Sequence, residues 1–359
     1  MKYYRLNRIL EKNAVYNIIF GERSNGKSYA VWEYAIERYT KYGEQLAVIR
    51  RETEDFKGKR AGKMCEGLVE NGVIKKLTHN EWSGVFYKSM QWYFCRYDDK
   101  NERIVSDEPF AYGFSLSAME HDKSTSFPKV TTILFDEFIT RYGYLNDEFV
   151  LLMNVISTIV RERNNVKIFM LGNTVNKYCP YFDEMGLKHI EKMKPGDIDI
   201  YQYGDTRLTV AVEYTSGNKS GKESDFYFAF DNPKLQMITT GAWEIDIYPH
   251  CPVKYKPHDV IFRYFIKFDG HLLQCNIVVV NGYAFTFVHE KTTDLQNPDK
   301  DIIYSIEYDY RPNHRRNIKK PTDKIGTKIY SFFQNNKIFY QSNEIGEIMR
   351  NYLLWCSSN

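Results

Sequence analysis

The sequence lacks a long hydrophobic run, and this absence is the first to narrow the class of protein. The longest apolar-leaning stretch, Phe149 to Val160, is interrupted by Asn154, Ser157 and Thr158, and it falls well short of the ~20 residues that cross a bilayer. The first residues mix charged and apolar side chains and have no continuous apolar core followed by a small-residue cleavage site. We therefore expect no membrane span, no secretory signal and a location in the cytosol.

Glycine, proline and cysteine are also scarce. The 21 glycines and 11 prolines among 359 residues are too few for a disordered or collagen-like chain. The six cysteines form no Cys-x-x-Cys pair and have no histidine at zinc-finger spacing, which argues against structural zinc and against a disulfide framework. We expect the cysteines to be buried free thiols.

The chain is rich in the side chains that build cores, since 43% of its residues are hydrophobic and 16% are aromatic. At ~150 residues per domain, its length favours two domains. In the first half, hydrophobic periodicity predicts strands at 15–20, 46–51, 131–138 and 166–171 and helices at 27–39 and 147–160. This is the order of a βαβ fold with a mainly parallel sheet.

The pattern changes after about residue 192. Turn-forming residues crowd the region from about 195 to 240, where we expect a linker. Beyond it, strand-like runs recur at hairpin spacing and helix-compatible segments follow. The expected strands are 260–268, 271–280, 283–290 and 302–308.

Residues 21–28, Gly-Glu-Arg-Ser-Asn-Gly-Lys-Ser, match the phosphate-binding pattern G-x-x-x-x-G-K-[ST] between an expected strand and an expected helix. In such a loop the backbone N–H groups surround the phosphates, the lysine neutralises phosphate oxygens and the hydroxyl ligates Mg²⁺. The predicted cofactors are therefore ATP and Mg²⁺. The predicted nucleotide-binding residues of the loop are Gly21, Arg23, Ser24, Asn25, Gly26, Lys27 and Ser28.

A second acidic site follows the buried strand Ile-Leu-Phe at 133–135. Asp136 is the expected Walker B acid and the second metal ligand beside Ser28. Glu137 can polarise a water for attack on the γ-phosphate, which favours an ATP hydrolase over a kinase. The alternative is that Glu137 is a solvated loop acid.

Two further candidates follow helix 147–160 and strand 166–171. Asn173, at the end of the strand, is the expected γ-phosphate sensor, unless it is a plain turn residue. Arg161 and Arg163 follow the helix, where cations suit the helix dipole. One of them could instead reach the γ-phosphate of a neighbouring subunit.

Local basic clusters are candidates for DNA contact, although solvated surface is an equally good reading of each. The clusters comprise Lys57, Lys59, Arg60 and Lys63 after the second strand, Arg141 after the Walker B strand, and six Lys/Arg between Arg311 and Lys324. Binding through such cations depends steeply on salt. Because the net charge is only +3, a DNA-binding face must be local.

Taken together, these motifs resemble the DNA packaging ATPases, or encapsidation proteins, of φ29-type small tailed phages. The resemblance rests on five segments and extends more weakly through the C-terminal half. The segments are GERSNGKSYA (21–30), KYGEQ with the following Ile-Arg-Arg (41–51), DKSTSFPKVTTILFDEFI (122–139), VRER (160–163) and LGNTV (171–175). One departure is that Glu52-Thr53 stands where the family has a basic residue after Arg-Arg.

The resemblance implies an α/β, ASCE-class P-loop ATPase that forms a homo-oligomeric ring, by family a pentamer, and drives double-stranded DNA into a prohead. The implied partners are DNA, the portal (connector) and a structural RNA, and no membrane. The protein is expected in the host cytoplasm, transiently at the portal vertex and absent from the mature virion. On this resemblance Arg161 is the trans-acting finger, and Lys123 is a second basic residue that reaches across the subunit boundary.

The resemblance also implies a C-terminal α+β domain that looks like RNase H but has lost its nuclease acids. The sequence agrees, since strand 260–268 offers Arg263 and Lys267 and the nearest acid, Asp269, falls in a turn, whereas a two-metal nuclease needs converging carboxylates. We expect no nuclease activity and a DNA- or portal-binding role. The expected boundaries are an ATPase domain at 1–195, a linker at 196–240 and the vestigial nuclease at 241–359.

Two rival functions remain open. One is another ASCE DNA translocase or a large terminase with an active nuclease. The other is a nucleotide-gated scaffold with negligible turnover.

Overall fold

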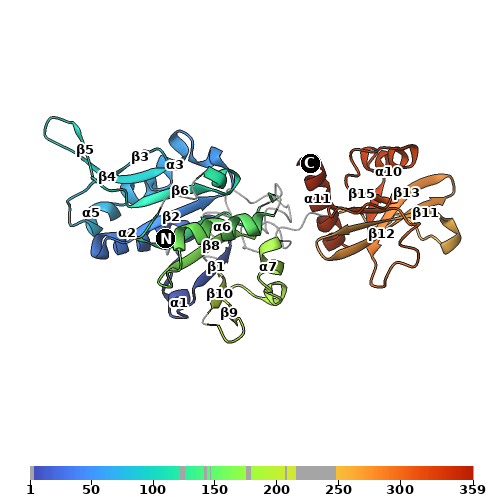
Figure 1. The fold of residues 1–359 in the computed structure, drawn as a ribbon, viewed down its shortest axis with the longest axis horizontal. Helices are drawn as coiled ribbons and strands as arrows, with labels where there is room; N and C mark the ends of the chain where they lie inside the picture. Colours follow the sequence, from blue (N-terminus) through green and yellow to red (C-terminus); the bar gives the residue numbers. More distant parts are fainter. Residues whose placement is uncertain are drawn as a thin grey trace, which may run out of the picture. The chain divides into compact units, whose positions relative to one another are not determined.

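The computed structural model describes residues 4–121, 126–140, 144–145, 147–174, 179–206, 208–215 and 248–358. These residues divide into two compact units, one containing the residues up to 215 apart from Tyr144 and the other containing 248–358 (Figure 1). Within the described ranges, no helix combines the length and the apolar character that a membrane crossing needs. The six cysteines are free; Cys251 is half-buried and the other five are buried.

The first unit is built on a sheet that has ten strands among the described residues. These are β1 (Tyr16–Gly21), β2 (Gln45–Arg50), β3 (Gly84–Lys88), β4 (Gln91–Tyr97), β5 (Arg103–Val105), β6 (Ala111–Ser115), β7 (Val130–Asp136), β8 (Lys167–Asn173), β9 (Ile198–Gln202) and β10 (Thr209–Tyr214). Their order is β3-β4-β6-β2-β7-β8-β1-β10-β9, with β5 beside β4. The strands from β6 to β10 in this order pair in parallel, and antiparallel strands close both edges.

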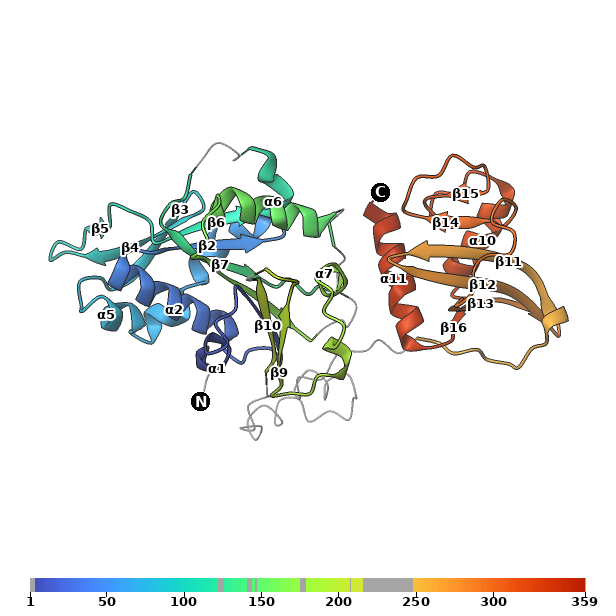
Figure 2. The same ribbon diagram turned by 60° about the horizontal axis from the view of Figure 1, so that its bottom comes forward.

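Helices cover both faces of this sheet. They are α1 (Asn7–Leu10), α2 (Lys27–Tyr42), α3 (Lys59–Lys63), α4 (Glu66–Glu70), α5 (Val73–Leu77), α6 (Glu148–Val160) and α7 (Pro180–Glu184), with 3₁₀ turns η1 (Thr53–Phe56), η2 (Leu116–His121) and η3 (Ile190–Lys192). The connection from β1 to β2 and that from β7 to β8 run in opposite directions along the sheet. Right-handed crossovers therefore place α2 and α6 on opposite faces, as Figure 2 shows.

The core on the α2 face explains why the strands form where the sequence predicts them. Ile36 of α2 is fully buried with Ile19, Leu134 and Phe169 from three adjacent parallel strands. A strand that is buried on both faces reads as a continuous apolar run, as in β7, where all seven residues are buried. The parallel order brings the carboxyl ends of β1, β8, β7 and β2 to one edge of the sheet.

The expected linker at 196–240 is wrong in its first part. Residues 198–202 form β9, and residues 209–214 form β10, which pairs with β1 in parallel register. The first unit therefore continues to residue 215. The strands in this region were missed because they are short and lie between turn-forming residues. The apolar run of β10 covers only Val210 to Val212, and Glu213 and Tyr214 complete the strand. The rest of the expected linker, from 216, lies outside the described residues.

The second unit has a six-stranded sheet in its described part, with the order β15-β14-β11-β12-β13-β16. Its elements are η4 (Pro257–Asp259), β11 (Val260–Phe268), β12 (His271–Val280), β13 (Tyr283–Glu290), β14 (Ile303–Ser305), β15 (His314–Arg315), α10 (Lys324–Gln334), β16 (Ile338–Tyr340) and α11 (Asn343–Ser358). The meander β11-β12-β13 is confirmed, whereas β14 does not continue it and pairs in parallel with β11. Tyr352 of α11 packs against Phe268 of β11, with 5.8 Å between ring centroids.

Candidate nucleotide-binding site

The loop between β1 and α2 turns through left-handed backbone conformations. Gly26 has a φ of 90° and Ser24 a φ of 58°. Gly21 has a φ of 148°, and a Cβ there would lie 2.1 Å from Thr215 Oγ1. Gly26 is also the N-cap of α2 and has no side chain to accept from the first-turn N–H groups. The loop and helix thus form an anion site of the kind expected from the motif.

Lys27 lies inside this loop with only 6% of its surface exposed. Its Nζ donates to Glu22 O at 2.6 Å, Asn25 Oδ1 at 3.3 Å and Asn173 Oδ1 at 3.3 Å. Burial lowers the pKa of Lys27 to about 8, and the charges of Asp136 and Glu22 oppose this shift. The negative charge of a bound phosphate would therefore stabilise the charged form of this ammonium group.

Ser28 and Asp136 meet beside the lysine, because β7 ends where α2 begins. Ser28 Oγ donates to Asp136 Oδ1 at 3.1 Å. Neighbouring ligands of an octahedral Mg²⁺ at 2.0–2.1 Å are about 2.9 Å apart, so these two oxygens fit adjacent coordination positions. Burial raises the pKa of Asp136, and the Arg50 guanidinium opposes the rise. A hydroxyl and a buried carboxylate form a donor set that Mg²⁺ accepts when phosphates complete it.

Glu137 follows Asp136 with a φ of +61°, a strained conformation for a residue with a side chain. Its carboxylate is 64% exposed and pairs with Arg50 Nη1 at 2.8 Å. Arg50 Nη2 pairs with Asp136 Oδ2 at 3.0 Å, so one guanidinium bridges both acids. The buried Nε of Arg50 has no hydrogen-bond partner among the described residues.

The sequence prediction assigned no role to Arg50. Its signal was the Arg-Arg pair at the end of a strand, and β2 is the strand beside β7. Asn173 lies at this edge, where its side-chain oxygen accepts from Lys27. Of the remaining loop residues, Asn25 is buried and donates to Thr215 Oγ1 at 2.9 Å, whereas Arg23 and Ser24 are exposed.

The two arginines after α6 have different surroundings. Arg161 is exposed and has a φ of +42° at the C-cap of the helix. The Arg163 guanidinium donates to five main-chain carbonyls, those of Phe127, Pro128, Val130, Ile159 and Val160. Arg163 therefore ties the end of α6 to the start of β7, whereas the Arg161 side chain is exposed.

The proposed DNA-contacting residues are described in part. Lys57, Lys59 and Arg60 are exposed after β2. Lys57 pairs with Glu54 at 2.5 Å and Arg60 lies 3.9 Å from Asp55, so neighbouring acids reduce the local positive charge. Lys123 and Arg141 lie outside the described residues.

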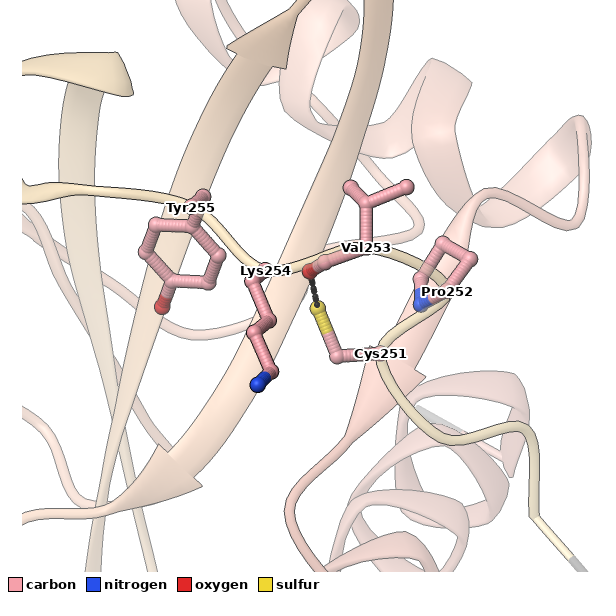
Figure 3. A pocket seen from close by; sticks show the side chains of 5 residues that line it. All are labelled: Cys251, Pro252, Val253, Lys254 and Tyr255. Atoms are coloured by element: carbon pink, nitrogen blue, oxygen red, sulfur yellow. Dashed lines mark hydrogen bonds between the residues drawn. The ribbon is translucent and has the colours of Figure 1, made fainter.

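In the second unit, β11 places Arg263 and Lys267 on one face, and Lys267 Nζ lies 3.6 Å from Glu307. Among the residues described, no three His, Cys, Asp or Glu side chains gather as a metal site. A shallow pocket is lined by Cys251, Pro252, Val253, Lys254 and Tyr255 (Figure 3). The Cys251 thiol donates to Val253 O at 3.1 Å. The lining of this pocket contains no phosphate-binding loop.

The fold and this site define a class. A phosphate-binding loop follows β1, one acid ends β7 and a second acid follows it, and an additional strand, β8, lies between β7 and β1. These are the features of an ASCE-class P-loop ATPase fold. The chain matches the family of the podovirus DNA encapsidation protein (Gp16) over residues 1–65 and 86–194. It is 31% identical to the DNA packaging protein of Bacillus phage B103 over 267 residues, which cover 66% of this chain and 76% of that protein. The chain belongs to this family, and the resemblance found in the sequence is confirmed.

Other relatives agree over shorter spans or in fold. The DNA packaging protein of Bacillus phage phi29 is 30% identical over 183 residues, which cover 50% of this chain and 49% of that protein. The solved structure of the Phi-28 gp11 DNA packaging motor is similar over 98% of both chains, with a TM-score of 0.56 and 19% identity. This structural likeness confirms the predicted α/β fold with a further domain.

Proposed function

We propose that this chain is the ATP-hydrolysing subunit of a viral packaging motor that moves double-stranded DNA into a preformed prohead. DNA packaging is the function of the family to which the chain belongs. The observation that carries the ATPase assignment is the meeting of Lys27, Ser28, Asp136 and Glu137 at one edge of the sheet. ATP and Mg²⁺ are the cofactors for which these side chains are suited.

In the proposed mechanism each residue has a separate task. The loop N–H groups and Lys27 hold the phosphates, and Ser28 and Asp136 hold the metal, which when bound neutralises charge on the phosphates. Glu137 orients the attacking water and accepts its proton. Because Arg50 pairs with the Glu137 carboxylate, Arg50 sets where that carboxylate points. Asn173, bonded to Lys27, is suited to respond to the γ-phosphate.

Several further roles rest on an assembled ring. Arg161 is proposed to act in the site of a neighbouring subunit, and Lys123 to reach across the same boundary. Lys57, Lys59, Arg60 and Arg141 are proposed to contact the DNA backbone. The proposed setting is the portal vertex in the infected cell, with the portal and a structural RNA as further partners, and the ring is proposed to be a pentamer.

The second unit is proposed to bind DNA or the portal without cleaving DNA. Its basic β11 face supports this proposal. A Mg²⁺- or Mn²⁺-dependent cleavage of plasmid DNA that disappears in Asp269→Asn or Glu290→Gln would overturn it and favour a terminase with a live nuclease.

The test of the ATPase proposal is phosphate release by the full-length protein and by Glu137→Gln. We expect the variant to bind ATP but to release phosphate at least 100-fold more slowly. Glu102→Gln, an exposed acid in the turn after β4, is the control and should match the wild type. Equal rates for Glu137→Gln and the wild type would favour the nucleotide-gated scaffold.

A further inference from the structure

A buried carboxylate lies close to the nucleotide site but belongs to none of its assigned groups. Glu148, the first residue of α6, is only 4% exposed. Its Oε2 accepts from Arg51 Nε and from Leu145 N–H, both at 2.7 Å, and its Oε1 accepts from Arg51 Nη2 at 2.7 Å and Tyr181 Oη at 2.6 Å. A buried charge is tolerated only when it is paired and hydrogen-bonded in this way. Such a complete set of donors fixes the start of α6 firmly in place.

The same arginine also holds the main chain of the proposed catalytic residue. Arg51 Nη1 donates to Glu137 O at 3.3 Å and Nη2 donates to Phe138 O at 3.0 Å. Glu137 has the left-handed φ of +61°, which surrounding contacts must maintain. Arg50 and Arg51 therefore hold different parts of the same segment. Arg50 pairs with the Glu137 carboxylate, and Arg51 donates to the main-chain carbonyls of Glu137 and Phe138.

Tyr181 of α7 completes the cluster and packs against aromatic side chains near the end of β7. Its ring lies 5.6 Å from Phe135, 5.8 Å from Phe138 and 6.1 Å from Phe149, measured between centroids. Burial, with the neighbouring Glu148 charge, raises the pKa of Tyr181 well above its ordinary value. The hydroxyl therefore remains protonated and available as a donor to Glu148.

The other end of α6 carries the arginine proposed to act in the next subunit. The helix runs from Glu148 to Val160, about 20 Å at 1.5 Å per residue, and Arg161 follows directly. A displacement of Glu148 is thus passed along a short rigid helix to Arg161. The Arg51–Glu148 pair connects the start of this helix to the main chain of Glu137 and Phe138.

We propose that Arg51, Glu148 and Tyr181 form a clasp of positioning residues that holds the Glu137 main chain and the α6 helix in one fixed relation. The catalytic carboxylate of one subunit and the arginine presented to its neighbour are then aligned by the same contacts. The clasp rests on the proposed ATPase function, because it has no task in a protein that does not hydrolyse ATP.

The first test measures kcat and KM for ATP with full-length Tyr181→Phe and Arg51→Lys. Each variant retains most of the packing or charge and removes part of the clasp. We expect kcat to fall about tenfold or more, since small misplacements of catalytic groups have large effects on rate, while KM and the affinity for a non-hydrolysable ATP analogue stay within about twofold. Tyr264→Phe, which removes a hydroxyl from an equally buried tyrosine of the second unit, should keep wild-type kcat.

The second test uses rings mixed from two inactive variants. Arg161→Ala subunits keep Glu137, and Glu137→Gln subunits keep Arg161, so a mixture should regain ATPase activity at their shared boundaries. Adding Tyr181→Phe to the Glu137→Gln subunit should lower the regained rate severalfold, because its α6 then presents Arg161 poorly. Adding Tyr264→Phe to the same subunit should not lower it.

The outcomes separate the two proposals. If the wild type is active and both clasp variants keep its kcat, the clasp is overturned and the proposed function stays intact. The same holds if the mixed rings regain an equal rate with and without Tyr181→Phe. A parallel loss of kcat, analogue binding and thermal stability also overturns it, because it indicates general unfolding. Wild-type protein that releases no phosphate overturns the proposed function and the clasp with it.

Discussion

At the scale of single residues, the site is defined by charges that are buried and paired. Lys27 is held by three oxygens within 3.3 Å, and burial lowers its pKa to about 8. Asp136 is buried beside Arg50 and Ser28, and Glu137 carries the strained backbone. A bound phosphate would place negative charge beside Lys27 and so raise the pKa of this lysine.

We predict that ATP binding takes up a proton at Lys27. The phosphate charge raises the lysine pKa above its free value of about 8, so the complex binds the proton more tightly than the free protein does. Affinity for MgATP should therefore fall as the pH rises through about 8, by at most about tenfold per pH unit. Calorimetry at pH 8.5 in buffers of different ionisation enthalpy measures the uptake. Affinity that stays constant up to pH 10 would contradict the prediction.

The two arginines after α6 should give opposite phenotypes. Arg163→Ala removes five hydrogen bonds to main-chain carbonyls and should destabilise the protein by about 2–4 kcal/mol. Arg161→Ala should lower the unfolding temperature less than Arg163→Ala does, and should lower ring ATPase about 10³-fold. Thermal unfolding and phosphate release, measured on both variants, check this. A stable, inactive Arg163→Ala would reverse the assignment.

At the scale of elements, the phosphate-binding loop is hydrogen-bonded to two segments that lie outside it in the sequence. Asn25 N–H₂ donates to Thr215 Oγ1, and the Tyr4 main chain donates to Asn25 O at 2.9 Å. Tyr4 Oη also donates to the buried Glu213 at 2.5 Å. The loop is therefore supported by the end of β10 and by the residues before α1.

This support predicts a difference between two glycines that share a positive φ. Gly21→Ala brings a Cβ to 2.1 Å from Thr215 Oγ1, whereas Gly43→Ala meets nothing within 4 Å. Gly43→Ala should cost only the left-handed strain of about 1–2 kcal/mol, and Gly21→Ala should cost more and weaken ATP binding. Urea unfolding and nucleotide titration measure both effects. Gly21→Ala that is no less stable than Gly43→Ala would refute the close approach.

The elements also show what the sequence could predict. β7 and α2 were predictable because a buried strand and an amphipathic helix have distinct periods. β10 was not, because its pairing with β1 is a long-range contact hidden among turn formers. The roles of Arg50 and Arg51 were not predictable either, since which acid each arginine meets depends on β2 lying beside β7 and on α6 starting at Glu148. The motif residues could be found from local spacing alone.

At the scale of the whole molecule, the charge balance constrains how DNA is held. The chain has 49 Lys and Arg against 46 Asp and Glu, a net charge of +3. Two of the exposed cations after β2, Lys57 and Arg60, have acids beside them. We therefore expect weak DNA binding through few phosphate contacts, as suits a motor that must release DNA in each cycle.

Salt titration tests this expectation. A plot of the logarithm of DNA affinity against the logarithm of salt concentration should have a shallow slope. Lys57→Ala or Arg60→Ala should each reduce the magnitude of this slope by about 1. Lys100→Ala, at the exposed turn after β4, should leave the slope unchanged. Equal slopes for all four proteins would remove the β2 loop from the DNA contact.

At the level of the assembled motor, ATP hydrolysis at this site is proposed to drive DNA into a prohead. The most direct measurement is DNase protection of double-stranded DNA by proheads mixed with ATP and either the wild-type protein or Glu137→Gln. We expect full-length protected DNA with the wild type and none with Glu137→Gln, although the variant still binds ATP and proheads. Equal protection with both proteins would contradict the proposal.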